Sequence, residues 1–317
     1  MTLFSILLVL LIEQFKPLRA DNPVYAWIRI FAARVEHSFN AGQPEHGRMG
    51  WLVMLSVLVV PVLVVYWLLA LVGPLAQFAW SVLIVYLTLG FRHYSHYFTA
   101  IQAALNDSDL TEARRLLAEW THQDVRDLDA PEIARLSVEN ALITTHRHVF
   151  GVFFWLLLPI GPAGAVIYRV AEYLARVWNA PEMKDESFGV FARKAFDLID
   201  WLPARLTAIA FAIVGNFEDA VYAWRNFARR WSNETTGIIL AAGGGAMGVR
   251  LGTPAEYASD IPEPDVTAYD SSVGDIEILP GEEPSARALQ STVGLIWRAL
   301  LLWILLLLLV SVANWLG

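Results

Sequence analysis

Long apolar runs are the dominant pattern along this chain. Residues 50–91 contain no charged side chain, and the dipeptide Gly73-Pro74 interrupts the run. A helix needs about 20 apolar residues to cross a bilayer. This run therefore predicts two spanning helices joined by a tight turn at the dipeptide. Residues 295–316 predict a third span. Its one charged residue, Arg298, lies near an end, where the side chain can snorkel to water.

Three other apolar segments are weaker. Residues 1–12 are apolar but short, and they predict a retained helix that spans the bilayer or penetrates it partway. Residues 149–168 contain prolines and glycines, and residues 202–214 are interrupted by Arg205. Each of these two segments predicts either a full span or a broken, re-entrant helix, which is tolerated where protein or water covers its backbone.

The basic residues favour one orientation in the membrane. Residues 13–49 contain five Lys and Arg, 92–148 contain six, 169–201 contain five and 224–298 contain six. If both weaker segments re-enter the membrane, every basic region lies on the cytoplasmic side, as the positive-inside rule requires. The predicted fold class is an all-α, polytopic integral membrane protein. We expect four to six membrane segments, including broken or re-entrant helices, together with cytoplasmic helical loops.

We expect a single membrane domain over 1–317, with three distinct parts. Residues 92–148 predict a cytoplasmic helical insertion, in which the polar residues 106–108 would cap a following amphipathic helix. Residues 253–290 contain nine acids and one arginine, which predicts a flexible acidic loop. Residues 295–316 would form the C-terminal transmembrane helix.

The composition supports a membrane protein and excludes several other classes. Apolar residues make up 56% of the chain and charged residues 17%, whereas about 25% is charged in a typical globular domain. The absence of cysteine excludes disulfides, a thiol nucleophile and a thiolate metal site. The net charge of −8 argues against a nucleic-acid partner. The lipid bilayer is the expected partner, and an oligomer is compatible with the sequence.

The most distinctive motif is the glycine-rich run 241–252. Five of the ten residues 243–252 are glycine. In a turn, successive N–H groups could form an anion nest, to which an arginine could add a charge-assisted hydrogen bond. The alternative is close helix packing, for which small residues are common in membrane bundles. The candidate ligand-binding residues of this run are Gly243, Gly244, Gly245, Gly248 and Arg250.

Three further candidates lie beside the weaker apolar segments. Glu139 and Asn140 precede the first segment and could hold Mg²⁺ or orient a substrate amine. The alternative is a polar helix at the membrane surface. Arg205 interrupts the second segment and needs a counter-charge or a wet cavity, and Asp197 or Asp200 is an available partner. We predict that these ligand-binding candidates and the glycine-rich run converge on one cytoplasm-facing cavity, with Glu139 as a further acid for Arg205.

Other catalytic patterns are weak in this sequence. His93 and His96 lie one helical turn apart, but no carboxylate follows at a matching spacing, so no metal site is predicted. No serine or threonine lies in a nucleophile-elbow pattern, so no Ser-His-Asp site is predicted. Catalytic residues therefore stay unassigned.

These motifs resemble the membrane superfamily that contains the cobalamin-biosynthesis proteins CobD/CbiB and the β-lactamase-induction protein AmpE. The motifs shared with CobD/CbiB are Glu139-Asn140, Phe153-Phe154-Trp155, Gly161-Pro162-Ala163-Gly164-Ala165, Tyr168-Arg169, residues 200–206 and residues 245–252. Two polar motifs of that family are absent. Phe15-Lys16-Pro17 replaces its Gly-Asp-Pro, and Ala171-Glu172-Tyr173-Leu174 replaces its Asn-Thr-Leu-Asp.

The resemblance to AmpE runs nearly end to end. It begins at Met1-Thr2-Leu3-Phe4, includes His93-Tyr94-Ser95-His96-Tyr97, and closes with a lone C-terminal helix. Typical AmpE proteins have lost the glycine-rich motif, which this chain keeps. This resemblance implies a multi-pass protein of a bacterial-type inner (cytoplasmic) membrane.

Two functions are therefore expected. The favoured one is an AmpE-like inner-membrane signalling or accessory protein, linked to cell-wall stress and β-lactamase induction. The alternative, implied by CobD/CbiB, is an adenosylcobinamide-phosphate synthase that joins a corrinoid carboxyl to aminopropanol phosphate. That enzyme would use ATP and Mg²⁺. Glu139 and Asn140 would hold the ion, while Arg205 and Arg250 would bind phosphate. A corrinoid or another anionic small molecule is the expected ligand. A transporter or structural role is the third alternative.

Overall fold

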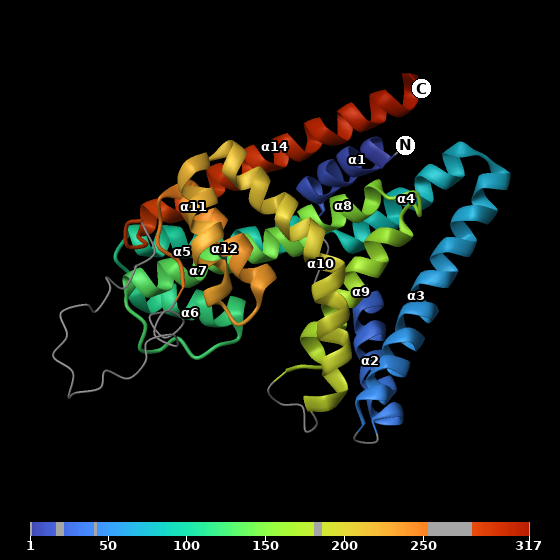
Figure 1. Cartoon of the computed structure of the whole chain (residues 1–317), viewed down its shortest axis with the longest axis horizontal. Helices are drawn as coiled ribbons and strands as arrows, with labels where there is room; N and C mark the ends of the chain where they lie inside the picture. The colour runs from blue at the N-terminus through green and yellow to red at the C-terminus, as the bar shows by residue number, and fades with distance from the viewer. Residues whose placement is uncertain (1, 17–21, 41–42, 181–185, 253–280, 317) are drawn as a thin grey trace. The chain divides into compact units, whose positions relative to one another are not determined.

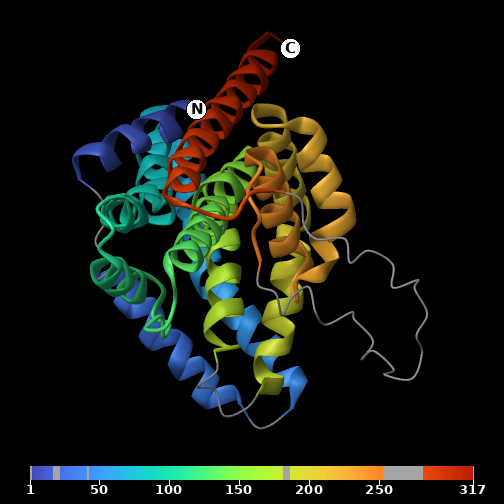
Figure 2. The same cartoon turned by 90° about the vertical axis from the view of Figure 1, so that its left-hand side faces the viewer.

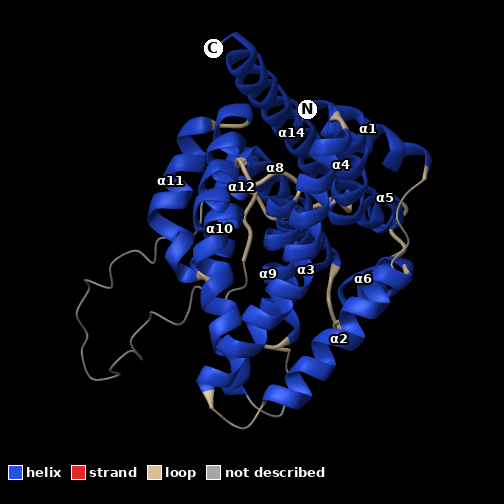
Figure 3. Cartoon of the chain, turned by 90° about the vertical axis from the view of Figure 1, so that its right-hand side faces the viewer, coloured by secondary structure: helices blue, strands red, loops and turns tan. Residues whose placement is uncertain are grey.

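The protein is described by a computed structural model in which helices dominate. Figure 3 shows helices and loops, and no strand, in the part of the chain that the structure describes. The two predicted classes of element, long apolar helices and shorter amphipathic ones, are both present. The described residues are 2–16, 22–40, 43–180, 186–252 and 281–316.

The chain forms two compact units, each built from separate stretches of sequence. The first contains residues 1–96, 144–203 and 300–317, and the second contains 97–143 and 204–299. The first unit holds α1 (Thr2–Phe15), α2 (Pro23–Phe39), α3 (Pro44–Val72), α4 (Pro74–Thr88), η1 (His146–Phe150), α8 (Gly151–Leu157) and α9 (Ala163–Val177). The second holds α6 (Leu110–Thr121), α11 (Phe217–Phe227), η2 (Ala228–Arg230) and α12 (Glu234–Met247). Residues of both units occur in α5 (Phe91–Asn106), α7 (Ala130–Thr145), α10 (Glu186–Val214) and α14 (Ala286–Leu316).

The apolar runs are helical, as the sequence predicts, but α4 has only 15 residues, fewer than the about 20 that the predicted second span requires. α3 ends at Val72 and α4 begins at Pro74, so the predicted break at Gly73-Pro74 is confirmed. Gly73 has φ 149°, a conformation that favours glycine, and Pro74 has no backbone N–H to continue α3. Among the described residues, two helical stretches, Glu45–Val72 and Ala286–Ala313, are long and apolar enough to cross a membrane.

The two weaker segments have different structures. Residues 149–168 are not one helix, because α8 ends at Leu157 and α9 begins at Ala163. Residues 202–214 are not a separate element, because they form the C-terminal half of the 29-residue helix α10. Most of the predicted acidic loop, over 253–280, lies outside the described residues.

Local capping differs by one residue from the prediction for the helix after 106–108. Asp109 is the N-cap of α6, and its carboxylate accepts a hydrogen bond from the Glu112 N–H at 3.0 Å. Ser108 instead takes a left-handed conformation, with φ 60°. The helical pattern after the cap is as predicted, since Ala113 and Leu117 are buried.

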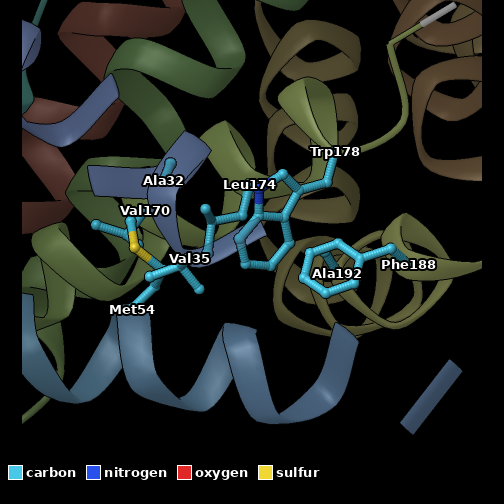
Figure 4. Close-up of a cluster of buried hydrophobic side chains, with 8 residues drawn as sticks. All are labelled: Ala32, Val35, Met54, Val170, Leu174, Trp178, Phe188 and Ala192. Carbon is cyan, nitrogen blue, oxygen red and sulfur yellow. The ribbon is translucent and has the colours of Figure 1, made fainter. Parts of the chain in front are cut away.

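The first unit has an apolar core between four helices. α2, α3, α9 and the first half of α10 surround it, as Figures 1 and 4 show. The rings of Trp178 and Phe188 meet edge to face, with centroids 4.8 Å apart. The core residues are Ala32, Val35, Met54, Val170, Leu174, Trp178, Phe188 and Ala192.

In the second unit, α11 and α12 form a tightly packed hairpin, coloured orange in Figures 1 and 2. The Asn216 N–H donates to the carbonyl of Ala246 at 3.0 Å, and this bond ties the start of α11 to the end of α12. A Cβ at Gly245 would lie 2.5 Å from the carbonyl oxygen of Asp219. The approach of α11 to α12 therefore requires a residue without a side chain at this position.

Candidate functional site

Glu139 and the end of the glycine-rich motif meet in the second unit. The Glu139 carboxylate accepts a hydrogen bond from the Gly252 N–H at 2.7 Å, across 113 residues of sequence. The same oxygen accepts from Arg135 at 3.2 Å, and both side chains of this pair are only 12% exposed. A charge-assisted bond to a backbone N–H holds the chain strongly. Glu139 therefore positions the segment that leaves α12.

Most of the glycine motif is helical, so over 241–247 the structure agrees with helix packing, the second of the two alternatives, and not with an anion-binding turn. Gly243, Gly244 and Gly245 are buried inside α12. A Cβ at Gly243 would meet Leu142 of α7, and a Cβ at Gly245 would meet the backbone of α11. Close packing of helices explains these glycines. Only Gly248 has the left-handed conformation of a turn, with φ 68°, and it ends α12.

Arg250 lies just beyond that turn, in a backbone clamp. Its N–H donates to the carbonyl of Glu282 at 2.9 Å, and the Glu282 N–H donates to Gly248 at 2.8 Å. The Arg250 side chain is exposed and donates to the Gly281 carbonyl at 3.2 Å. The clamp fixes the backbone of an arginine whose guanidinium group still faces solvent.

Arg205 is paired at the opposite end of α12. Its guanidinium donates to Glu234, in the first turn of α12, at 3.3 Å. A helix rises 1.5 Å per residue, so about 21 Å of helix separates Glu234 from Gly248. The structure thus brings Glu139 to the glycine motif, whereas Arg205 contacts the other end of the same helix. A shared cavity for all the predicted residues stays a prediction.

The Mg²⁺ role expected of Glu139 and Asn140 stays a prediction, since Asn140 would bind an ion through its amide oxygen, whereas its hydrogen bond to Leu136 uses the amide nitrogen. One oxygen of Glu139 already accepts two hydrogen bonds, and the Asn140 amide donates to the Leu136 carbonyl at 2.9 Å. Among the described residues, no three acidic or histidine side chains group together as metal ligands. The His93 side chain lies outside the described residues. A Mg²⁺ ion here would depend on ligands from a bound phosphate and water.

The first unit contains a buried polar cluster that the sequence motifs do not predict. His146 Nε2 lies 2.8 Å from Asp200 Oδ1, and the Tyr168 hydroxyl donates to the same oxygen at 2.9 Å. All three side chains are buried. In the tautomer with its proton on Nε2, His146 donates to this carboxylate oxygen. Asp200 is therefore paired with His146, and the ion-pair partner of Arg205 is Glu234 instead of Asp197 or Asp200, the two acids that the sequence offered.

Backbone geometry builds this cluster. His146 begins η1, a single π-helical turn, which is a rare form that occurs often at functional sites. Gly151 follows η1, and a Cβ there would fall within the phenol ring of Tyr168. The missing side chain lets Tyr168 reach Asp200.

A charged network continues from the same helix. Glu172 is 3% exposed and accepts hydrogen bonds from Arg169 and Arg176, both at 3.1 Å. Burial alone would raise the pKa of the Glu172 carboxyl group, but the guanidinium groups of Arg169, Arg176 and Arg147 outweigh it and hold the pKa below its usual value. Glu172 is therefore an ionised, buried acid in a cationic surrounding.

Sequence reasoning missed this cluster because its members are far apart in the chain. His146 and Asp200 are separated by 54 residues. One signal was present, since buried charged residues next to apolar segments require partners. That signal indicates that a partner exists but does not identify it.

In the part of the chain that the structure describes, the fold is all-helical and includes two helices of membrane-spanning length. The family model described as CobD/Cbib protein matches residues 7–278. The chain belongs to the CobD/CbiB family. The family and the apolar helices together indicate association with a membrane. No solved structure matches the chain significantly.

Named relatives come from several bacteria. The chain is 32% identical over 297 residues to the cobalamin biosynthesis protein CobD of Stutzerimonas stutzeri, covering 92% of each chain. It is 34% identical over 203 residues to CobD of Chromobacterium violaceum, covering 64% of each. It is 26% identical over 259 residues to CobD of Desulfotalea psychrophila, covering 75% of this chain and 76% of the relative.

These comparisons correct the favoured functional expectation. Each of these three relatives is named as a cobalamin biosynthesis protein, and none of the three is named AmpE. The AmpE-like signalling interpretation is therefore wrong, and the cobalamin alternative is the better supported one. The sequence misled because several of the same motifs are shared by both branches of the superfamily.

Proposed function

We propose that this chain acts in cobalamin biosynthesis as an adenosylcobinamide-phosphate synthase. It would join the amine of an aminopropanol phosphate to a corrinoid carboxyl group. The family match over 7–278 and the names of the relatives support this proposal. The observation that carries it is the 2.7 Å bond from the Gly252 N–H to Glu139, because this bond joins the two most distinctive motifs shared with CobD/CbiB.

Amide formation needs an activated carboxyl group, and ATP with Mg²⁺ would supply the activation. Glu139 Oε1 already accepts hydrogen bonds from Arg135 and from the Gly252 N–H, so this carboxylate is assigned a positioning role and not that of a ligand of the ion. The role proposed for Glu139 is to hold the backbone of the Arg250 segment. Arg250, with an exposed guanidinium group, would bind a phosphate of the ligand.

The predicted ligand-binding set stays a proposal, with different roles for its members. Glu139 would position the motif, the helical glycines would allow α12 to pack, and Arg250 would contact the ligand. Arg205, paired with Glu234, would contribute from the other end of α12. The full proposed set is Glu139, Asn140, Arg205, Gly243, Gly244, Gly245, Gly248 and Arg250.

Genetic complementation tests this function. We expect the gene to restore cobalamin synthesis in a strain that lacks the synthase. Arg250→Ala should abolish the rescue, whereas Arg287→Ala, which removes another exposed arginine of the second unit, should preserve it. Membrane insertion of each variant is measured in parallel. Failure of the wild-type gene, inserted and expressed, would refute the enzyme function. Rescue by Arg250→Ala would instead remove only the role of that residue.

We further propose a multi-pass arrangement in the bacterial inner membrane, with the bilayer as partner and regions 13–49, 92–148 and 224–294 in the cytoplasm. The break between α8 and α9 supports a re-entrant segment there. Reporter fusions after residues 127 and 264 should both indicate the cytoplasm. Opposite sides for these two fusions would contradict the arrangement. A fusion after residue 184 would distinguish four spans from six.

A further inference from the structure

Two short sequences in the first unit share one arrangement, a buried polar residue followed directly by an arginine. His146-Arg147 lies in η1, and Tyr168-Arg169 lies in α9. The buried members both contact Asp200 Oδ1, at 2.8 and 2.9 Å. These contacts fasten η1 and α9 to the first half of α10. Each arginine therefore follows an anchored residue, and its backbone is held in place.

The two anchored arginines lie close together although both are cationic. Arg169 Nη1 donates to the backbone carbonyl of Arg147 at 3.4 Å. The Arg147 guanidinium lies over the ring of Phe196, with its Cζ 5.8 Å from the centroid. Both guanidinium groups also lower the pKa of one carboxyl group, that of Glu172. Like charges gathered in a half-buried place repel one another unless an anion balances them.

The carboxylates of this region do not balance all the arginines. Glu172 is shared by Arg169 and Arg176. Asp200 is bound to His146 and Tyr168. Among the described residues, no carboxylate forms an ion pair with Arg147. The Arg147 guanidinium therefore shares the charge of Glu172 at longer range with Arg169 and Arg176, and it has no close carboxylate of its own among the described residues.

We propose that Arg147 and Arg169 form an anion-binding subsite for a phosphate group. A guanidinium presents N–H donors in a planar fork that matches phosphate oxygens, and stacking on Phe196 holds the plane of Arg147. A phosphomonoester in solution and a phospholipid headgroup share this chemistry. The subsite goes beyond the proposed function, because it requires binding of a phosphate group whatever reaction the chain performs.

Thermal stabilisation of the purified full-length protein by phosphate tests the subsite. In detergent, the unfolding temperature is measured against inorganic phosphate, with chloride at equal ionic strength as the reference. We expect phosphate to stabilise the wild-type chain. Arg147→Gln should weaken the apparent affinity by about tenfold or more, the loss expected for one charge-assisted bond. Arg34→Gln, which removes an exposed arginine of α2, is the matched control and should respond like the wild type.

Two further measurements distinguish a soluble phosphate from a lipid headgroup and control for misfolding of the variants. In nanodiscs, the unfolding temperature is compared between phosphatidylglycerol and phosphatidylcholine. If phosphatidylglycerol stabilises the wild type more and Arg147→Gln abolishes this difference, the ligand is a lipid headgroup and the subsite is supported. Arg147→Lys keeps the charge but loses the fork, so it should fold and bind more weakly than the wild type. If neither phosphate nor phosphatidylglycerol stabilises the wild type, or if Arg147→Gln, Arg147→Lys and Arg34→Gln respond alike, the subsite does not exist. Complementation tests the enzyme function separately, so the two proposals can fail independently.

Discussion

Alanine at two glycines of α12 tests whether this motif serves helix packing. A Cβ at Gly245 would lie 2.5 Å from the carbonyl oxygen of Asp219 and 2.8 Å from the Cα of Ala220. Both atoms belong to the backbone of α11. A Cβ at Gly243 would lie 2.7 Å from a methyl carbon of Leu142. That atom ends a flexible side chain, so it can move away.

The expected magnitude follows from two opposing terms. Alanine favours a helix over glycine by about 1 kcal/mol, and both variants gain this term. Overpacking against atoms that cannot rotate away costs about 1–3 kcal/mol, and this cost falls mainly on Gly245→Ala. Because the helix term is common to both variants, Gly245→Ala should be less stable than Gly243→Ala by about 1–3 kcal/mol.

The assay is parallel unfolding of the purified full-length variants in one detergent. Using the pair cancels the shared helix-propensity term and most effects of the detergent. The reasoning is refuted if Gly243→Ala is the less stable variant, or if the two unfold together. Two fully stable variants that both fail complementation would show that these glycines serve the ligand instead of packing.

Two other predictions concern the buried charges of the first unit. Asp200→Asn should lower the free energy of unfolding by about 1–3 kcal/mol, because His146 and Tyr168 lose a carboxylate acceptor. Asp124→Asn, at an exposed position, is the control. Equal losses of stability in the two variants would contradict a stabilising role for the buried cluster. The pKa of the Glu172 carboxyl group is lower in the folded state than in the unfolded state. Ionised Glu172 therefore stabilises the folded protein fully above the unfolded pKa of about 4.3. This stabilisation is lost as the pH falls through the folded pKa. Glu172→Gln should therefore have a lower free energy of unfolding than the wild type at neutral pH, and this difference should shrink in acid. A difference that does not change with pH would argue against an ionised Glu172.

Local features of this fold were readable from the sequence. The helix break at Gly73-Pro74 and the amphipathic helix of 110–121 depend on neighbouring residues only. The cap of that helix was misplaced by one residue, because several adjacent polar residues could each act as the cap. The break inside 149–168 was one of two alternatives, since prolines and glycines permit a break without requiring it.

The site was less readable than the fold. Glu139 and the glycine-rich motif were both recognised, but the bond between Glu139 and Gly252 spans 113 residues. Arg205 was expected to pair with an acid such as Asp197 or Asp200, yet its ion-pair partner is Glu234. Composition shows that a charge beside an apolar segment must be neutralised, whereas the identity of the partner depends on which helices pack together.

The sequence by itself determined the apolar helices, their main break and the family, because these follow from the order of residues along the chain. Only the folded chain shows that the glycines lie inside α12, that His146 reaches Asp200, and that Arg147 forms no close ion pair with a carboxylate among the described residues. The physical reason is distance. Helix formation depends on residues within a few positions of one another, whereas ion pairs and close helix contacts depend on groups that only folding brings within a few ångströms.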